Sequence, residues 1–593
     1  MFIPNMSGTL MKISENPDTR YEFEIWFDYT KRAINLIREG VMVVVPNFAT
    51  NTTETHLSIL EIVSILPMHY ALGSDTSGYP GFVVEAARNA CLDWEQESES
   101  TEDTTKIKCI AVPTNLELKL LNNQTIFQID ENLPMVGSEV KLLNHEYTQR
   151  AINLGIDSNT ENILTIGQLV RDPDVNIWLR IEDLIKVHFG VFGFTGAGKS
   201  NFLSTLVSKI LSETKEHIKI VFFDLMGEYT ALLIDQLVKL ENAKIICLEE
   251  RTLPDIVFRC INKDIEYTDK IAEIFSKTIL LPKMLKRRQH DFIKPLGTLI
   301  RQGKIRLWIK TADITVTQAV KEGNPWSNRT KGKGPYQAIS KIVGQVFGRY
   351  RDTNDTELTP ELAKTLLENL KAHKDFQSYE SDFDTLVSIL NEVIASGKNK
   401  IRCGISTEQI IEELNDKSYS SFYIINSHNP DILREFAYRL GNQCYDNRRM
   451  TGEIAPLCLF IFDEADEFIP QQPKGSYELS SSIAMTIARR GRKFGLGLGI
   501  ATQRVRYLDT SIMAQPHTYF ISKLPRQTDR EVVSQAFGIS EDIFRQTFKF
   551  KKGDWLLVSY DATGLDAIPI PIHVENADDR IGRFLDDINK FEK

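Results

Sequence analysis

The sequence predicts an α/β core built on a parallel sheet, interrupted by a large helical insertion and preceded by a small β-barrel or sandwich. Three observations support this fold class. The first ~150 residues contain short β-branched runs separated by turn-forming residues. Later apolar runs alternate with helical patterns, as expected of strands buried on both faces of a parallel sheet. A long, largely helical stretch separates two of these runs. The predicted core strands lie at 187–194, 218–223, 421–426, 457–462 and 494–502.

The composition is that of a globular protein. The 593 residues are 42% hydrophobic and 25% charged, with a net charge of −10, which excludes a uniformly basic nucleic-acid binder. The seven cysteines form no C-x-x-C pair, which argues against a disulfide framework or a structural zinc site. Neither a signal peptide nor an apolar stretch of membrane-spanning length is evident. We therefore expect a soluble, cytoplasmic protein without membrane contact.

Charge is distributed unevenly along the chain. Residues 283–351 hold 16 lysines or arginines and three acids, a local net charge of +13. Residues 93–103 hold six acids and no base, which is typical of a solvated loop. The basic window predicts either a surface for DNA phosphates or a solvated face that binds an acidic partner protein.

The elements of the N-terminal region follow from period-2 patterns. Short apolar runs predict strands at 41–48, 56–66, 81–87, 106–112 and 116–121, followed by a turn-containing segment at 133–143. A helix is expected near 22–38. The domain boundaries are then expected at 1–165 for the N-terminal domain and 166–575 for the core. A mainly helical insertion is expected at about 255–415, and 576–593 forms a C-terminal tail.

A complete phosphate-binding motif follows the first core strand. Residues 193–200 match G-x-x-x-x-G-K-[ST], with an apolar run before them and a helical pattern after them. The backbone amides and the helix N-terminus would converge on phosphate oxygens, Lys199 would reach the β- and γ-phosphates of ATP, and Ser200 would ligate Mg²⁺. The predicted nucleotide-binding residues here are Gly193, Thr195, Gly196, Ala197, Gly198, Lys199, Ser200 and Asn201.

Two carboxylates end the strand at 457–462. This strand end would bring Asp463 beside the magnesium ion and direct Glu464 toward the water that attacks the γ-phosphate, as a general base or a positioning group. The next acids, Asp466 and Glu467, are expected to face solvent or cap a helix.

Further polar residues follow two other core strands. Asp224 and Glu228 are candidates for organising metal, water or a neighbouring subunit, although a turn with a helix cap fits equally well. Gln503, at the end of the strand at 494–502, can sense the γ-phosphate. The arginines before that strand can either reach a phosphate of an adjacent subunit or form a solvated helix end.

These motifs resemble the HerA family of hexameric DNA-translocating ATPases, within the HerA–FtsK group of P-loop proteins. The matching segments are GFTGAGKSNF, D-x-x-G-E-Y at 224–229, FIFDEADEFIP and ARRGRKFGLGLGIATQ. The resemblance implies a RecA-like core after an N-terminal β-barrel, a homohexamer, ATP bound between subunits and DNA threaded through the channel. It assigns family motif positions to Lys199, Ser200, Asp463, Glu464 and Gln503. Arg489 and Arg492 match its A-R-x-G-R-K positions and are better trans-acting candidates than Arg490. Leu225 and Met226 depart from the Pro-His that many relatives carry.

Two functions remain open on the sequence. The first is a motor that hydrolyses ATP to move double-stranded DNA and works with a separate effector protein, in a setting such as anti-phage defence. The second is an ATPase ring that assembles and gates a nuclease or a sirtuin-like NAD-consuming effector without long-range translocation. No segment resembles a nuclease or an NAD-binding site, so the effector is expected on another chain.

Overall fold

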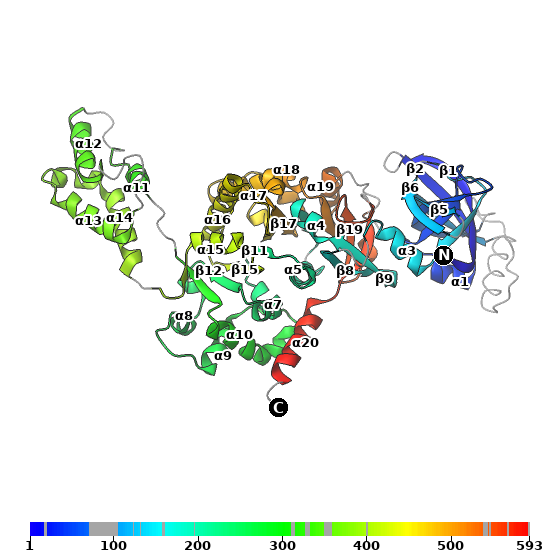
Figure 1. Cartoon of the computed structure of the whole chain (residues 1–593), viewed down its shortest axis with the longest axis horizontal. Coiled ribbons are helices and arrows are strands. Elements are labelled where there is room, and N and C mark those ends of the chain that lie inside the picture. Colours follow the sequence, from blue (N-terminus) through cyan, green and yellow to red (C-terminus); the bar gives the residue numbers. More distant parts are fainter. Residues whose placement is uncertain are drawn as a thin grey trace, which may run out of the picture.

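The computed structural model describes most of the chain, and the parts it describes are residues 1–16, 20–69, 105–121, 124–130, 132–156, 161–194, 196–309, 315–326, 333–348, 358–398, 401–537, 544, 547–565 and 568–590. The strand predicted at 81–87 and the acidic loop at 93–103 lie outside these residues. Helices and strands keep the labels of Figure 1.

The N-terminal region is an antiparallel sheet that closes on itself. Strand β2 pairs with β1 on one side and with β5 on the other, so β2, β1, β7, β3, β4 and β5 form a small barrel to which β6 adds. Its interior includes Phe23, Ile25, Val43 and Val45. The strands are β1 (Phe2–Asn16), β2 (Arg20–Asp28), β3 (Met42–Pro46), β4 (Thr55–His69), β5 (Thr105–Leu121), β6 (Gln124–Ile129) and β7 (Glu139–Leu143).

The prediction of a helix near 22–38 is wrong over the first part of this range. Residues 20–28 form β2, and only α1 (Lys31–Leu36) is helical. Phe23, Ile25 and Phe27 alternate with less buried neighbours and point into the barrel. This period of two suits a strand with one buried face, and the helical pattern begins only after Thr30 caps α1.

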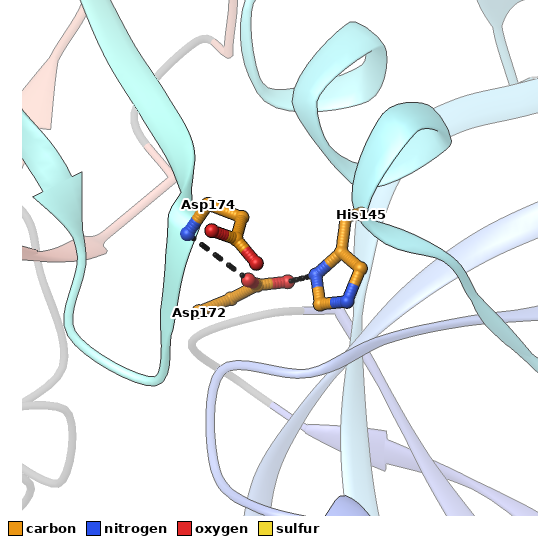
Figure 2. Close-up of side chains that lie close together, drawn as sticks. All are labelled: His145, Asp172 and Asp174. Atoms are coloured by element: carbon orange, nitrogen blue, oxygen red, sulfur yellow. Dashed lines mark hydrogen bonds and ion pairs between the residues drawn. The ribbon is translucent and has the colours of Figure 1, made fainter.

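A short helix, α3 (His145–Ile152), follows the barrel and packs on β9 (Asp172–Arg180). His145 is hydrogen-bonded to Asp172, and the backbone N–H of Asp174 donates to the other oxygen of Asp172 over 3.4 Å (Figure 2). The three side chains lie within 4.8 Å of one another, with His145 and Asp174 exposed. Their contacts therefore link the end of the barrel to the next sheet.

The second sheet has 13 strands in the order β14-β13-β12-β15-β11-β16-β17-β10-β18-β19-β20-β8-β9. Neighbours from β14 to β18 are parallel, and those from β18 to β9 are antiparallel. The strands are β8 (Ile163–Leu169), β9, β10 (Phe189–Phe192), β11 (Ile218–Asp224), β12 (Ala243–Cys247), β13 (Ile305–Trp308), β14 (Gly404–Ile405), β15 (Ser421–Asn426), β16 (Leu457–Asp463), β17 (Leu496–Thr502), β18 (Thr518–Ile521), β19 (Asp554–Ser559) and β20 (Ile570–His573). The five core strands predicted from apolar runs are confirmed as β10, β11, β15, β16 and β17.

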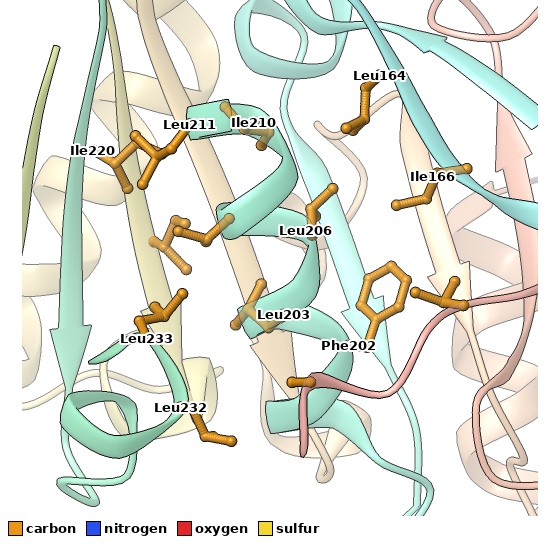
Figure 3. Close-up of a cluster of buried hydrophobic side chains, with 14 of the residues drawn as sticks. Leu164, Ile166, Phe202, Leu203, Leu206, Ile210, Leu211, Ile220, Leu232 and Leu233 are labelled. Carbon is orange, nitrogen blue, oxygen red and sulfur yellow. The ribbon is translucent and has the colours of Figure 1, made fainter. Parts of the chain in front are cut away.

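Helices cover both faces of this sheet, which explains why its strands are continuous apolar runs (Figure 1). In β11, Ile220 and Phe222 enter one apolar cluster, whereas Val221 and Phe223 enter the cluster on the other face. Figure 3 shows the first face, where Leu203 and Leu206 of α5 (Lys199–Glu213) lie among side chains from several strands and loops.

The helices of the first face are α5, α6 (Tyr229–Leu232), α7 (Ile234–Lys239), α8 (Asp255–Ile261), α9 (Asp269–Thr278), α10 (Ile293–Arg301) and α20 (Ala577–Lys590). The helices of the second face are α15 (Thr407–Asn415), α16 (Pro430–Thr451), α17 (Ser476–Arg490), α18 (Thr510–Met513) and α19 (Gln527–Phe537). Helix α4 (Ile181–Lys186) links β9 to β10. Short 3₁₀ turns are η1 (Glu250–Thr252), η2 (Leu285–Phe292), η5 (Ala465–Glu467), η6 (Gly491–Phe494) and η7 (Val505–Tyr507).

The insertion expected at about 255–415 does not form one helical body. Strands β13 and β14 lie inside this range and extend the edge of the parallel sheet, while α8 to α10 pack on its face. A separate helical unit with its own apolar cluster lies between β13 and β14 and projects from the sheet (Figure 1). It contains α11 (Val316–Gly323), α12 (Lys333–Phe347), α13 (Pro360–Ala372), η4 (Phe376–Asp382) and α14 (Asp384–Lys398).

The C-terminal tail expected at 576–593 contains helix α20, which packs against α5 and η2. Arg580 donates to both oxygens of the buried Asp235 over 2.6 Å, and Asn201 accepts from the backbone N–H of Ala577 over 2.9 Å. The end of the chain is therefore attached to the first turn of the phosphate-loop helix.

Candidate active site

The phosphate loop connects β10 to α5. Gly196 and Gly198 have φ angles of +87° and +98°, a region that disfavours residues with a side chain. The loop is fixed by a hydrogen bond from the N–H of Phe194 to Lys523 O over 3.0 Å. Thr195 lies outside the described residues. The remaining predicted residues, Gly193 and Gly196 to Asn201, surround the N-terminus of α5, where free amides favour anions.

Lys199 is the buried cation of the site. Its Nζ is paired with Asp463 and lies 2.9 Å from Oε1 of Glu464, so the loop contacts the end of β16. Only 3% of Lys199 is exposed. Burial lowers the pKa of Lys199, but the two carboxylates outweigh burial and hold this pKa above its ordinary value.

Glu464 occupies an unusual backbone position directly after β16. Its φ of +51° and ψ of +53° are left-handed, a region that few residues other than glycine adopt. Its Oε1 accepts a hydrogen bond from Nε2 of Gln503 over 3.0 Å. Burial and the neighbouring Asp463 raise the pKa of Glu464. The cation of Lys199 lowers this pKa but offsets the increase only in part. The structure thus brings together Lys199, Asp463, Glu464 and Gln503, all predicted from the sequence.

Tyr229 joins this group through a contact that the sequence analysis did not foresee. Its hydroxyl donates to Oδ2 of Asp463 over 2.9 Å, and its ring packs on Phe222 with centroids 4.0 Å apart. Ser200 also lies within hydrogen-bonding reach of Tyr229. The hydroxyl of Ser200 and the carboxylate of Asp463 form an all-oxygen donor set, which suits Mg²⁺ together with phosphate oxygens and water.

The contacts of Asp224 are those of the turn alternative of the sequence analysis. Its Oδ1 accepts from the N–H groups of Gly227 and Glu228 over 2.7 and 3.2 Å, and its Oδ2 accepts from that of Tyr229 over 2.9 Å. Burial raises the pKa of Asp224 to about 7 despite these bonds. The carboxylate holds the turn that orients Tyr229, which corresponds to the cap alternative, whereas Glu228 lines the pocket beside the phosphate loop.

The expectation that Asp466 faces solvent is wrong, whereas the side chain of Glu467 is partly exposed, at 38%. Asp466 is buried and accepts a hydrogen bond from Oγ1 of Thr502 over 2.6 Å. Glu467 is held by Arg434, whose Nε donates to Glu467 O over 2.6 Å and whose side chain is 4% exposed. These contacts fix both sides of the turn that follows Glu464.

A pocket of about 660 Å³ runs beside the phosphate loop and the N-terminus of α5. Its lining includes Gln503 and Glu228, the apolar segment from Leu280 to Met284, and two C-terminal residues that the sequence analysis missed, Lys552 and Asp578. No motif marks these two residues, since they approach the loop only through the packing of α20 and β19.

The predicted trans-acting arginines lie away from this pocket. Arg489 and Arg492 are exposed in the segment before β17, while Gln503 follows the other end of that strand. A seven-residue strand is about 20 Å long, so the two arginines and Gln503 belong to opposite edges of the sheet. The structure therefore does not bring Arg489 or Arg492 to the phosphate loop of their own chain.

The basic window at 283–351 does not form one surface. Arg288 donates to Asp291 and Asp586 over 2.7 and 2.6 Å. Lys304 donates to three carbonyls at the end of α7, and Lys283 and Lys286 line the pocket of the phosphate loop. Five of the cations lie outside the described residues: Lys310, Arg329, Lys331, Arg349 and Arg351.

Among the described residues, no helix combines the length and apolar character required to cross a membrane.

Comparison with known proteins gives a consistent result. Residues 164–426 match the family model described as the central domain of helicase HerA. The probable DNA double-strand break repair helicase HerA of Methanocaldococcus jannaschii is 23% identical over 524 residues, which cover 86% of this chain and 91% of that protein. The DNA double-strand break repair helicase HerA of Pyrococcus furiosus is 23% identical over 438 residues, covering 72% and 73%.

The solved structure of VirB4 from Thermoanaerobacter pseudethanolicus covers 71% of this chain and 98% of its own, at 14% identity and a TM-score of 0.36. The phosphate loop between β10 and α5, at the end of a parallel strand, is that of a P-loop core, and the matched family model covers this segment.

Proposed function

Because residues 164–426 belong to the HerA family's central domain, this chain is an ATPase, and we propose that it couples ATP hydrolysis to movement along double-stranded DNA. One observation carries the proposal most directly. Lys199, Asp463, Glu464 and Gln503 meet at one edge of the sheet in a single hydrogen-bonded and ion-paired group. These are the cation, metal ligand, water-orienting carboxylate and phosphate-sensing amide that ATP hydrolysis requires.

In this proposal Lys199 exchanges its carboxylate partners for the phosphates of ATP. Ser200 and Asp463 hold the magnesium ion, which would screen the negative charge of the β- and γ-phosphates. Glu464, released from Lys199, orients the attacking water or accepts its proton. Gln503 would contact the γ-phosphate and change the position of Glu464, to which it is hydrogen-bonded.

We further propose that six copies form a ring in which Arg489 or Arg492 completes the site of an adjacent subunit. The exposure of both arginines and their separation from their own phosphate loop support a role in trans. Arginine suits this role because its guanidinium stays protonated and can bind phosphate oxygens in a planar, bidentate manner. DNA would pass through the ring, and cations of the described part of the basic window, such as Arg287 and Lys341, are exposed and available to contact its phosphates.

We also propose that this chain works with a separate effector protein. The unit formed by α11 to α14 has its own apolar cluster and projects from the sheet, so a partner can bind it without blocking the nucleotide site (Figure 1). The partner would be a nuclease or a sirtuin-like enzyme, and a role in anti-phage defence would follow from such an effector. The reading frames beside the gene test this part of the proposal most directly.

The deciding experiment measures ATP hydrolysis by the purified chain with and without duplex DNA, alone and after copurification with the product of the adjacent reading frame. A motor requires duplex-stimulated hydrolysis and displacement of a strand or protein at a distance from the loading point. Lys199→Ala serves as the inactive control. Hydrolysis without displacement, combined with ATP-dependent effector activity, would favour the gating ring over the motor.

A further inference from the structure

We propose that Asp578 binds the ribose hydroxyls of the nucleotide and thereby selects ribonucleotides over deoxyribonucleotides. This inference rests on the proposed ATPase site and adds a substrate-selecting residue from the C-terminal helix of the same chain. Asp578 lines the pocket that Lys199 and Ser200 also line. Its Oδ1 is buried and has no hydrogen-bond donor among the described residues. An acceptor in this state gains free energy when a ligand supplies a donor.

The position of Asp578 relative to the phosphate loop is fixed by several contacts. Asn201, the residue after Ser200, is hydrogen-bonded to Asn576 and accepts from the N–H of Ala577 over 2.9 Å. The N–H of Asp578 in turn donates to Oδ1 of Asn576 over 3.2 Å. The start of α20 is thus attached to the first turn of α5, and Asp578 cannot move independently of the loop.

The direction of the nucleotide in the pocket follows from its two ends. Gln503 lines the pocket and is hydrogen-bonded to Glu464, so it marks the end at which the γ-phosphate would be hydrolysed. Asn201 follows Ser200 in the first turn of α5 and is hydrogen-bonded to the start of α20, which carries Asp578. The sugar follows the α-phosphate, so it would lie at the end marked by Asn201 and Asp578. The apolar residues Leu280, Leu281, Pro282 and Met284 line the same pocket and offer a surface for the base.

The charge of Asp578 selects the group that it can bind. A carboxylate repels phosphates, so its partner must be a neutral donor of the nucleoside. Lys552 lines the same pocket beside the loop, with its Cγ and Cε 3.7 and 3.8 Å from the position that a Cβ on Gly198 would occupy. Its cation attracts Asp578 and keeps an anionic side chain tolerable near the phosphates. Acidic side chains bind ribose hydroxyls in dinucleotide sites for the same chemical reason.

The test compares binding of ADP, 2′-deoxy-ADP and 3′-deoxy-ADP by calorimetry, with the full chain and magnesium present. The parent protein is expected to bind ADP about tenfold more tightly than at least one deoxy analogue, which is the effect of a hydrogen bond to a charged acceptor. Asp578→Ala should bring this ratio close to one. Asp579→Ala, which removes the same charge from the next, exposed residue, should preserve the ratio.

Equal ratios in the parent and in Asp578→Ala would overturn the inference, as would a parent protein that does not distinguish ADP from either analogue. A change in the ADP-to-GDP ratio with an unchanged ribose ratio would assign Asp578 to the base and also overturn it. Asp578→Asn, which preserves the shape of the side chain, replaces the alanine variant if the latter unfolds. ATP hydrolysis that depends on Lys199, measured on the same preparations, separates failure of this inference from failure of the proposed function.

Discussion

The hydroxyl of Tyr229 donates a 2.9 Å hydrogen bond to Oδ2 of Asp463 and so connects two motifs that are 234 residues apart in the sequence. The Oδ1 of Asp463 accepts a hydrogen bond from Lys199, and its Oδ2 accepts one from Tyr229. Together these contacts fix the orientation of the carboxylate. Outer contacts of this kind orient a metal ligand before the metal binds.

Tyr229→Phe should therefore raise the magnesium concentration required for half-maximal ATP hydrolysis, by about tenfold. The substitution keeps the ring that packs on Phe222 and removes only the hydroxyl. The measurement is a magnesium titration at saturating ATP. Tyr423→Phe removes a buried hydroxyl that is hydrogen-bonded to Glu413, and is the matched control. An unchanged magnesium requirement in Tyr229→Phe would remove Tyr229 from the metal site.

Glu464→Gln should retain nucleotide binding and lose turnover by at least about 100-fold, because the amide keeps the shape but cannot accept a proton. Single-turnover hydrolysis and calorimetric binding separate the two effects. Glu467→Gln, three residues further along the chain, is the control. Parental turnover in Glu464→Gln would assign the water-orienting role to another group.

The pH profile offers a second test of Glu464. Since burial raises the pKa of this carboxyl, its active ionised form is lost at a higher pH than for an ordinary glutamate. The turnover number of the parent should accordingly fall as the pH decreases through this raised pKa, with an acidic limb above 4.5, the ordinary pKa of a glutamate. A turnover number that is flat down to that value would contradict glutamate catalysis at this position.

Rings mixed from Lys199→Ala and Arg492→Ala chains should regain part of the ATPase activity that each variant lacks. Some interfaces would then pair an intact phosphate loop with an intact arginine, and loss of such an arginine costs about 10³-fold or more. The same mixing with Arg489→Ala identifies the acting residue. The assembly of mixed hexamers is verified by mass. If mixing restores no activity with either Arg492→Ala or Arg489→Ala, neither arginine completes the site of an adjacent subunit.

His188 should make the folded protein sensitive to mild acid. The N–H of Leu498 donates to Nδ1 over 3.0 Å, and Nε2 lies 3.0 Å from Ala488 O, so the neutral ring bridges the end of α17 to β17. Burial lowers the pKa of His188 from 6.5 to about 4. The unfolded chain therefore binds the proton first, and stability should fall as the pH decreases from about 6.5 to about 4, by at most about 1.4 kcal/mol per pH unit.

The measurement compares thermal unfolding of the parent and of His188→Gln across this range. The glutamine variant should be less stable at neutral pH but should lose less stability on acidification. Parallel pH dependences would show that His188 does not control acid stability. The oligomeric state is checked at each pH, since assembly also changes the apparent stability.

Charge reversal at Arg287 and Lys341 should weaken duplex DNA binding and reduce its dependence on salt concentration, since each is an exposed cation of the basic window. Fluorescence anisotropy at several salt concentrations measures both quantities. Arg288→Glu is the contrasting variant, since it breaks ion pairs with Asp291 and Asp586 and should destabilise the docking of α20. Unchanged DNA affinity with loss of effector binding would assign these two residues to contacts with a protein partner.

The local features of the site could be predicted from the sequence. The glycine spacing of the phosphate loop, the apolar strands and the carboxylates at the end of β16 are each encoded within about ten adjacent residues. Backbone geometry alone directs such residues to the same edge of a parallel sheet. The predicted group of Lys199, Asp463, Glu464 and Gln503 follows from this geometry, and the structure brings these residues together.

Other features required the tertiary structure, because they depend on which distant segments pack together. Asp224 could be assigned to a ligand or to a cap until its three backbone donors were known. Arg288 appeared as one cation of a basic window, yet its partner Asp586 lies almost 300 residues away. Asp578 approaches the phosphate loop only because α20 packs on α5.

The sequence by itself determined the phosphate loop, the two carboxylates that follow β16 and the buried strands of a parallel sheet, since short-range spacing and apolar periodicity encode them. Only the tertiary structure decided which charges neutralise one another, which edge of the sheet carries Arg489 and Arg492, and which C-terminal residues line the pocket. The physical reason is that the energy of a charge or a hydrogen bond depends on burial and on its partners, and both are set by contacts between segments far apart in the chain.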